Sequence, residues 1–464
     1  MEILTYIIKG IFIAFLIYTY LYICMWIAGI ITSNSRLSDY KEKQKTVRKI
    51  FPDQMAQTMP VGVLIPSYNE KACIGDTVKS LLENDYPVMD IIVVDDGSTD
   101  HTEESLVEEL KLKQIKYTYK EEIPTEKVIR CYGRVFGKKR VLYVIKENGG
   151  KSDALNCGLN FCRYPHCLVL DADTHVEKNA VRIMAKQFLM DKRTIVCAGT
   201  VGESLYKSFK YKKLKFAQKA LVLFQKLEYY RTFYMQRIMF DHFNANLIVS
   251  GAFAMFDAEL VKCVGGYRTD TIGEDMELTM RLHAFCKSQR RPYKISFVPE
   301  ARCSTEIPFS YRDYFNQRRR WHIGMIQSLK NHFYMIGQSY YGWAGIAAGT
   351  VIMFYELIAP FVEILGFITL MAGYAIGIVN IEMALKFIAV YLLFIILTQG
   401  LLINALRCYG VEKIKPGEYF LLECISVLEF LFFHPLNMFI KLSAFAGYKR
   451  HKETWKHITR KRDE

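Results

Sequence analysis

Residues 91–100 read IIVVDDGSTD, so four β-branched residues are followed at once by two aspartates and a glycine. A short apolar run that ends in turn-forming residues is typical of a buried strand. Three further runs have the same character, at residues 61–65, 141–145 and 167–170. Helix-like stretches lie between the runs, at residues 72–83, 152–161 and 177–188. This alternation predicts an α/β domain with a mainly parallel sheet, which binds ligands at the carboxyl ends of its strands.

The composition of the whole chain is too apolar and too basic for an ordinary soluble enzyme. Its 464 residues are 51% hydrophobic and carry a formal net charge of +14. Positive charge of this size indicates a membrane surface or phosphate ligands. Zinc-finger and RNA-binding signatures are absent from the sequence, so we expect no nucleic-acid partner. The twelve cysteines include no C-x-x-C pair, which argues against a disulfide framework or a zinc ribbon.

Apolar segments flank the predicted α/β domain on both sides. Residues 10–31 contain no charged residue and exceed the roughly 20 residues that a helix needs to cross a bilayer. Bulky residues continue to the end of this run, so we expect a retained anchor and not a cleaved signal peptide. The lysines and arginines between residues 36 and 49 predict that the chain then enters the cytosol. Three apolar stretches follow the domain, at residues 345–377, 384–406 and 419–445.

The order of these segments predicts an integral membrane protein in six parts. The basic residues near the end of the chain favour a cytosolic tail, so the C-terminal region must cross the membrane an even number of times, two or four. The expected parts are an N-terminal anchor (1–35), a basic cytosolic linker (36–59), the α/β domain (60–308), an amphipathic interfacial segment (309–340), a membrane region (341–446) and the tail (447–464).

Polar loops follow the first two predicted strands. The first loop contains Tyr68 and Glu70, and the second contains Asp96. Carboxylates at adjacent strand ends can accept hydrogen bonds from the ribose and the base of a nucleoside. Turn formation explains either loop equally well, because Asp-Gly-Ser is common turn chemistry.

Two further motifs indicate a phosphorylated ligand. Residues 148–152 resemble a P-loop, but that motif needs a glycine where this chain has Ile145, so only Lys151 is kept as a candidate phosphate contact. Asp171 and Asp173 follow the strand at residues 167–170. Alternate carboxylates at a strand end, with phosphate oxygens to complete the shell, suit Mg²⁺ or Mn²⁺.

The last two motifs lie closer to the C-terminal apolar region. Asp275 lies in the acidic first turn of a predicted helix, where it either complements the helix dipole or acts as a general base. Residues 317–321 read QRRRW. Arginine matches phosphate oxygens in bidentate fashion, and tryptophan offers a flat face to a sugar. An interfacial anchor is the alternative explanation.

Taken in order, these six motifs resemble those of the processive family 2 glycosyltransferases with a GT-A fold, over about residues 60–330. That group includes bacterial cellulose, hyaluronan, chitin and poly-N-acetylglucosamine synthases. The resemblance implies that Asp275 is the base and that the second carboxylate of the D-x-D, Asp173, meets the metal on the diphosphate. It also implies substrate contacts from Tyr68, Glu70, Asp96, Lys151, Asp171, Gln317, Arg320 and Trp321.

Within this resemblance, the first three substrate contacts hold the uridine with Lys151 beside it, Arg320 neutralises the diphosphate, and Trp321 faces the acceptor sugar. The chain departs from the family in two places. Gly273 stands where many members have threonine, and Arg318 and Arg319 make the last motif more basic than usual. We expect those two arginines to keep an interfacial role.

The expected function is that of an inverting glycosyltransferase in a bacterial plasma membrane, with its catalytic domain in the cytosol. It would transfer sugar from UDP-GlcNAc or UDP-Glc to a growing β-linked polysaccharide, processively and coupled to export. Membrane lipid and accessory export proteins are the expected partners. A polyprenyl-phosphate monoglycosyltransferase is the alternative, although such enzymes typically lack Q-x-x-R-W. A transporter with a nucleotide-binding domain is the non-enzyme alternative. The donor sugar stays open, with UDP-GlcNAc favoured by the resemblance.

Overall fold

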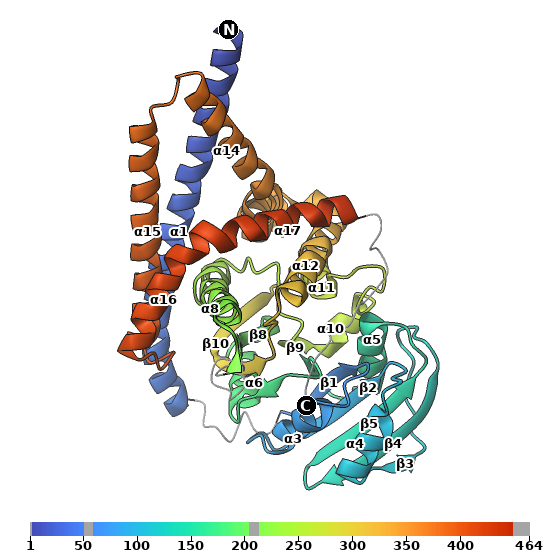
Figure 1. Ribbon diagram of the computed structural model, residues 1–464. Coiled ribbons are helices and arrows are strands. Elements are labelled where there is room, and N and C mark those ends of the chain that lie inside the picture. Colours follow the sequence, from blue (N-terminus) through green and yellow to red (C-terminus); the bar gives the residue numbers. More distant parts are fainter. Residues whose placement is uncertain (1, 51–58, 204–212, 449–464) are drawn as a thin grey trace.

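The structure is a computed structural model that describes residues 2–50, 59–203 and 213–448. A mixed sheet organises the α/β domain (Figure 1). In the described residues it has ten strands, in the order β3 (Lys113–Ile115), β4 (Val128–Phe136), β5 (Lys139–Lys146), β2 (Met89–Asp95), β1 (Val61–Ser67), β6 (His166–Leu170), β9 (Phe253–Asp257), β8 (Thr194–Glu203), β10 (Lys294–Thr305) and β7 (His175–Val176).

The centre of the sheet is parallel. Strands β5, β2, β1 and β6 run in one direction, and Val63 of β1 pairs with Ile91 of β2 and with Leu168 of β6. Every residue of β1 and β2 is buried. Helices cover both faces of such a sheet, which explains why its strands are continuous apolar runs instead of alternating patterns. All four strands expected from the sequence are present, and their polar loops meet at one edge.

Outside the centre, β8 and β10 are parallel to each other, but the other pairings depart from the mainly parallel arrangement that the sequence predicts. Strand β9 lies antiparallel between β6 and β8, and β4 is antiparallel to β5. Only Gly137 and Lys138 separate β4 from β5, and a connection this short can join only antiparallel strands. Gly137 has a φ of 63°, a left-handed conformation that glycine adopts without strain.

Helices pack on the sheet and connect it to the C-terminal region. Helix α5 packs on β1 and β2, and α6 packs on β8 and β10. The three helices expected at residues 72–83, 152–161 and 177–188 correspond to α3, α5 and α6. The helices of the domain are α3 (Ile74–Leu82), α4 (Thr102–Leu110), α5 (Lys151–Phe161), α6 (Ala180–Met190), α8 (Phe216–Arg231), α9 (Arg237–His242), α10 (Ala258–Cys263), α11 (Glu274–Ser288) and α12 (Tyr311–Asn331).

Long apolar helices flank the domain. They are α1 (Glu2–Ile50), α14 (Ala359–Ala375), α15 (Ile381–Cys408), α16 (Pro416–Leu428) and α17 (His434–Gly447), with π-helical turns η1 (Thr232–Gln236), η4 (Ala344–Gly349), η5 (Met353–Ile358) and η6 (Glu429–Phe433) at several junctions. Four helical segments of the described chain are long and apolar enough to cross a membrane, at residues 6–39, 344–375, 381–408 and 416–446.

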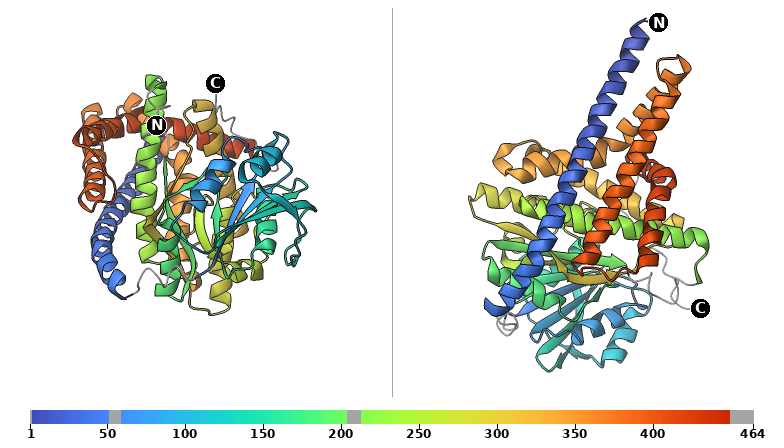
Figure 2. Two further views of the ribbon diagram at one scale, coloured as in Figure 1. Left: turned by 90° about the horizontal axis from the view of Figure 1, so that it is seen from below. Right: turned by 90° about the vertical axis from the view of Figure 1, so that its left-hand side faces the viewer.

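The apolar helices do not all point the same way. Figures 1 and 2 show α1 and α15 side by side, extending well beyond the domain. Figure 1 shows α17 at a steep angle to α15, across the helix α12. The packing of α17 on α12 includes a hydrogen bond of 2.7 Å from the Tyr314 hydroxyl to Asn437 Oδ1. The C-terminal region is therefore joined directly to the helix that carries the QRRRW motif.

Candidate active site

A cavity of about 780 Å³ lies between the sheet edge, α11, α12 and the apolar helices. Ten residues were predicted from the sequence to form the site, and eight of them line this one cavity: Glu70, Lys151, Asp171, Asp173, Asp275, Gln317, Arg320 and Trp321. Tyr68 and Asp96 lie outside its lining, in the two loops after β1 and β2. Residues that span about 250 positions of sequence are thus brought to one place.

The two loops predicted to hold a nucleoside are tied to each other. The backbone N–H of Asn69 donates to Ser98 Oγ at 2.9 Å, and the N–H of Thr99 donates to Asn69 Oδ1 at 2.7 Å. Asn69 has a φ of 55°, which the asparagine side chain tolerates better than most. These bonds fix the first loop against the second.

Asp96 is buried, and its carboxylate already has several protein partners. Lys146 Nζ donates to Oδ1 at 2.6 Å, while the N–H groups of Gly149 and Gly150 donate at 3.0 Å and 2.7 Å. Asp96 therefore holds the 148–150 loop, and that loop carries Gly149 and Gly150 into the cavity wall. From the sequence we expect Asp96 to contact the uridine. The structure shows in addition that its carboxylate binds the 148–150 loop.

Lys151 joins the D-x-D motif to the acidic turn of α11. Its Nζ lies 2.8 Å from Asp171 Oδ1 and 3.0 Å from Glu274 Oε1. The side chain of Asp171 is about one-third exposed, and those of Lys151 and Glu274 are more buried. Lys151 thus offsets the repulsion among carboxylates that converge from β6 and α11. Asp173 is buried, and its Oδ1 accepts a hydrogen bond of 3.1 Å from Thr305 Oγ1.

Asp275 lies in the first turn of α11 beside the loop that precedes β9. Its Oδ2 accepts a hydrogen bond of 3.1 Å from the N–H of Gly251. Burial, followed by the negative charge of Glu274, raises the pKa of Asp275 to about 6. The carboxylate is therefore ionised at neutral pH and is still a stronger base than an ordinary aspartate, which suits a general base.

Two glycines bring α12 against the start of α11. A Cβ on Gly273 would lie 2.7 Å from the carbonyl oxygen of Gly324, and a Cβ on Gly324 would lie 2.8 Å from Gly273 Cα. Side chains reinforce the contact, because Gln327 Oε1 accepts a hydrogen bond of 2.8 Å from the N–H of Ile272. The close approach gives a physical reason for glycine at position 273, where the resemblance leads us to expect threonine.

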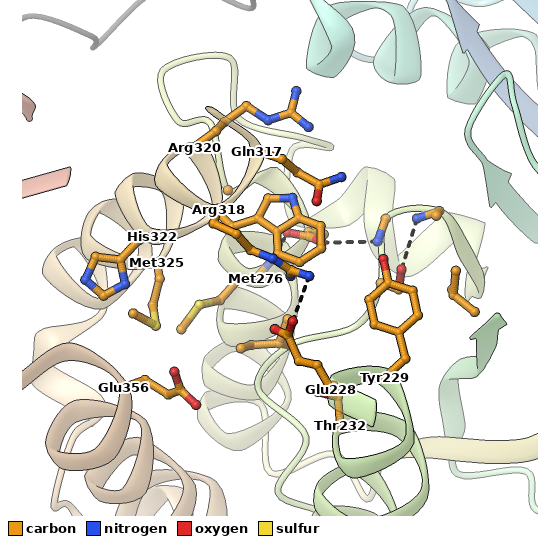
Figure 3. Close-up of a pocket in the computed structure, with 18 of the residues that line it drawn as sticks. Glu228, Tyr229, Thr232, Met276, Gln317, Arg318, Arg320, His322, Met325 and Glu356 are labelled. Atoms are coloured by element: carbon orange, nitrogen blue, oxygen red, sulfur yellow. Dashed lines mark hydrogen bonds and ion pairs between the residues drawn. The ribbon is translucent and has the colours of Figure 1, made fainter. Parts of the chain in front are cut away.

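The QRRRW motif occupies the first half of α12. Gln317 and Arg320 reach out from one side of the helix, while His322 and Met325 point toward Glu356 (Figure 3). The Oε1 of Gln317 is buried without a hydrogen-bond partner in the described part of the chain, while the residue itself lines the cavity. Trp321 is 45% exposed and lines the cavity.

The sequence suggests an interfacial role for Arg318, but the residue points into the protein. Its side chain is only 10% exposed, and its Nη2 lies 2.8 Å from Glu228 Oε2 of α8. The guanidinium turns inward because a carboxylate and two aromatic rings surround it, whereas the sequence pattern shows only its closeness to an apolar segment. Arg319 does not line the cavity.

The cavity continues away from the sheet and between the apolar helices. Its walls there carry rings from α1 and η5, including Tyr22, Trp26 and Tyr355. Two polar contacts lie in its wall: an ion pair of 2.8 Å between Glu356 Oε2 and Lys441 Nζ, and a hydrogen bond of 2.6 Å between His434 Nε2 and Glu363 Oε2. A passage with aromatic faces and paired charges suits a hydroxyl-rich ligand.

Several lining residues could not be found by sequence motif. Glu228 lies in the last turn of α8, far from any motif, and Arg231 at the end of the same helix pairs with Glu429. Glu274 could have been suspected, because it stands next to Asp275 in the acidic turn. Glu228 and Arg231 meet their partners only through contacts between segments that are distant in the sequence.

Comparison with known proteins now gives the class of this protein. Two family descriptions match it: "Glycosyl transferase family 2" over residues 62–265 and "Glycosyl transferase family group 2" over residues 166–438. The second covers more than half of the chain. The chain therefore belongs to the family 2 glycosyltransferases, and it is an enzyme of that class. This confirms the expected family, its α/β fold class and its enzyme class.

The chain is also similar in sequence to individual proteins. The chain is 26% identical over 294 residues to a poly-β-1,6-N-acetyl-D-glucosamine synthase of Staphylococcus epidermidis, covering 63% of this chain and 61% of that protein. The synthase of Staphylococcus aureus strain COL is 27% identical over 271 residues, covering 58% of this chain and 56% of that protein. The alignments thus span less than two thirds of these relatives.

Solved structures were found as well. A mannosyltransferase from Pyrobaculum calidifontis, in complex with GDP-Man and Mn²⁺, has a TM-score of 0.49 and 18% identity, covering 82% of this chain and 97% of that chain.

Proposed function

We propose that this glycosyltransferase moves N-acetylglucosamine from UDP-GlcNAc to a growing β-linked polysaccharide, processively and with export of the product. The observation that carries the proposal is the single cavity. It contains Asp275, the D-x-D pair and Trp321 at one end and continues between apolar helices at the other. The naming of relatives as poly-β-1,6-N-acetyl-D-glucosamine synthases supports this donor and product.

The nucleotide would bind at the edge of the sheet. In this proposal Tyr68, Glu70 and Asp96 hold the uridine, and Lys151 and Asp171 line the way to the diphosphate. Arg320 would neutralise the diphosphate, since a guanidinium stays charged and binds phosphate oxygens with two parallel hydrogen bonds. Gln317 would accept a hydrogen bond from a hydroxyl of the bound sugar.

The donor set of the D-x-D fits a divalent metal that is shared with the substrate. Asp171 and Asp173 offer two carboxylates, and in the described ranges no group of three or more His, Cys, Asp or Glu side chains could hold a metal by itself. Diphosphate oxygens would complete the shell, as hard cations such as Mg²⁺ or Mn²⁺ prefer. A bound cation would supply positive charge for the leaving UDP.

Asp275 would take the proton from the acceptor hydroxyl. The oxygen of that hydroxyl then attacks the anomeric carbon, the bond from this carbon to the UDP oxygen breaks, and UDP leaves with the bonding electron pair. One displacement inverts the anomeric centre, which gives a β-linkage. Charge that develops on the diphosphate would be stabilised by Arg320, and such electrostatic stabilisation is often the largest catalytic contribution.

The apolar helices support a membrane location, which we propose to be the bacterial plasma membrane with the α/β domain in the cytosol. Helices α14 and α15 run in opposite directions, and α17 lies across α12 (Figure 1). That arrangement favours two crossings after the domain, with α17 at the membrane surface. Paired charges and aromatic rings in the passage favour a polysaccharide over a polyprenyl chain, which needs an apolar groove.

The test uses the purified full chain in lipid nanodiscs with Mg²⁺ or Mn²⁺. Radiolabelled UDP-GlcNAc, UDP-Glc and GDP-Man are supplied separately, and the product is sized by gel filtration and extracted into organic solvent. A long β-linked polymer from UDP-GlcNAc alone is the expected result. A single sugar on an extractable lipid would instead support the polyprenyl-phosphate alternative. Absence of transfer from all three donors would refute the proposed donor class.

A further inference from the structure

A partly buried ion pair joins α8 to α12 on the cavity wall. Glu228 Oε2 lies 2.8 Å from Arg318 Nη2, and the two side chains are 28% and 10% exposed. Figure 3 shows the pair as a link between the two helices, with Arg318 pointing away from Gln317 and Arg320. Burial raises the pKa of Glu228, while the Arg318 charge opposes that rise. The pair therefore lies on the cavity wall, and Arg318 points away from Arg320, the residue proposed to neutralise the diphosphate.

Arg318 is the middle member of a stack on one face of α12. Its guanidinium carbon lies 4.2 Å from the ring centroid of Trp321 and 4.9 Å from that of Tyr314. Positions 314, 318 and 321 are spaced by four and three residues, so their side chains lie one above another on the helix. Cation–π attraction holds such a stack, and it is strongest where water is excluded.

The far end of the stack is anchored to another element. The Tyr314 hydroxyl donates to Asn437 Oδ1 at 2.7 Å, and the Tyr314 ring lies 5.1 Å from that of Phe433. Tyr314 is fully buried. Trp321, at 45% exposed, is the most open member of the stack, and it lines the cavity together with Arg318. Its indole therefore has one face against a fixed guanidinium, and the orientation of that guanidinium is set by Glu228.

We propose that Glu228 and Arg318 are positioning residues that hold the indole of Trp321 as the platform for the acceptor sugar. The inference rests on the proposed function in one respect, namely that Trp321 faces the acceptor. Arginine suits this task better than lysine, because its planar guanidinium can stack on the indole and bind a carboxylate at the same time. Removal of Glu228 would leave a buried cation uncompensated and free to turn from the ring.

The first test measures acceptor use with a β-1,6-linked N-acetylglucosamine pentasaccharide at saturating UDP-GlcNAc. The variants are Arg318→Ala, Arg318→Lys and Glu228→Gln, and Arg319→Ala is the matched control that removes the same charge from the next position. We expect Arg318→Ala and Glu228→Gln to raise the acceptor KM about tenfold. Arg318→Lys keeps the ion pair without the planar stack and should fall between these variants and the wild type. Arg319→Ala should stay within about twofold of the wild type.

The affinity for UDP separates positioning from loss of the whole site. Calorimetry should give a UDP Kd for Arg318→Ala and Glu228→Gln equal to that of the wild type, because neither residue is placed on the nucleotide. An acceptor KM that rises no more than in Arg319→Ala would overturn the proposal. An equal loss of UDP affinity and acceptor affinity would also overturn it, because that result indicates a general structural role.

A second measurement reports on the indole without requiring turnover. In a chain with Trp26, Trp343 and Trp455 replaced by phenylalanine, Trp321 is the only tryptophan. Arg318→Ala and Glu228→Gln should lower its fluorescence anisotropy and increase its quenching by acrylamide, while Arg319→Ala should change neither. Unchanged indole mobility would refute the positioning role. If the enzyme transferred no sugar from UDP-GlcNAc and the indole still became mobile, the proposed function would fail and the positioning role would stand.

Discussion

Asp275 combines two properties that a general base needs, a raised basicity and a fixed direction. The N–H of Gly251 holds one oxygen, and the start of α11 holds the other through the N–H of Met276 at 2.7 Å. Asp275→Asn keeps the shape of the side chain but cannot accept a proton. We expect it to abolish sugar transfer while the UDP Kd, measured by calorimetry, stays nearly unchanged. Loss of UDP binding in this variant would refute the assigned role.

The pKa of the same carboxyl predicts how the rate depends on pH. A base must be ionised to act, and burial together with Glu274 raises the pKa of Asp275 to about 6. The transfer rate should therefore fall as the pH drops through about 6 and level off above about 7. Glu274→Gln removes a like charge and should move this limb of the profile to lower pH. A profile that is flat from pH 5 to 8 would contradict the prediction; the UDP Kd over the same range is the control.

Asp173 is the residue at which we test the proposed metal site. If the cation bridges this carboxylate and the diphosphate, UDP should bind more tightly with Mn²⁺ than with EDTA. Asp173→Ala should remove that difference and weaken Mn²⁺-dependent UDP binding by at least about tenfold. Binding in EDTA serves as the control, since it should be the same for both proteins. An Mn²⁺ effect that survives in the variant would place the metal elsewhere.

At the scale of elements, the contact between α11 and α12 decides how Asp275 is placed relative to the QRRRW motif. Gly324 lies inside α12, where helix propensity alone favours alanine by about 1 kcal/mol. A Cβ there would meet the backbone of Gly273, and overpacking of this kind costs about 1 to 3 kcal/mol. We therefore expect Gly324→Ala to lower both the Tm and the transfer rate, as measured by thermal unfolding and by UDP release.

The matched control for that contact is Gly417→Ala in α16. A Cβ at Gly417 meets nothing within 4 Å, so this variant should keep the rate of the wild type and should keep or slightly raise its Tm through helix propensity. Equal Tm values for the two alanine variants would show that the glycine contact can open without cost.

At the scale of the whole molecule, we expect the passage among the apolar helices to affect the length of the polymer more than the rate of the transfer step. Lys441→Met removes the partner of Glu356 and leaves an unpaired carboxylate in the wall. Polymer from UDP-GlcNAc should become severalfold shorter, while the first transfer to a short acceptor keeps its rate. Lys386→Met is the control, because the Lys386–Glu382 pair is exposed. Unchanged product length in the Lys441 variant would argue against this passage as the polymer path.

Much of this architecture could be predicted without coordinates. The strands at 61–65, 91–94, 141–145 and 167–170 are local signals, since a β-branched run that ends in Asp, Asn or Gly specifies both a buried strand and its exit loop. Parallel strands place those loops at one edge, so the convergence of Glu70, Asp171 and the 148–152 loop could be expected. Hydrophobic length likewise predicted an anchor and a C-terminal apolar region.

The sequence by itself thus determined the class of fold, the order of the motifs and which residue types gather at the candidate site, because these depend on short-range patterns. Only the tertiary structure decided which partner each side chain takes. Arg318 turns inward because Glu228 arrives from a helix some 90 positions earlier. Gly273 replaces the expected threonine because Gly324 occupies the space. Contacts between distant segments follow from packing in three dimensions, and no local pattern of residues records them.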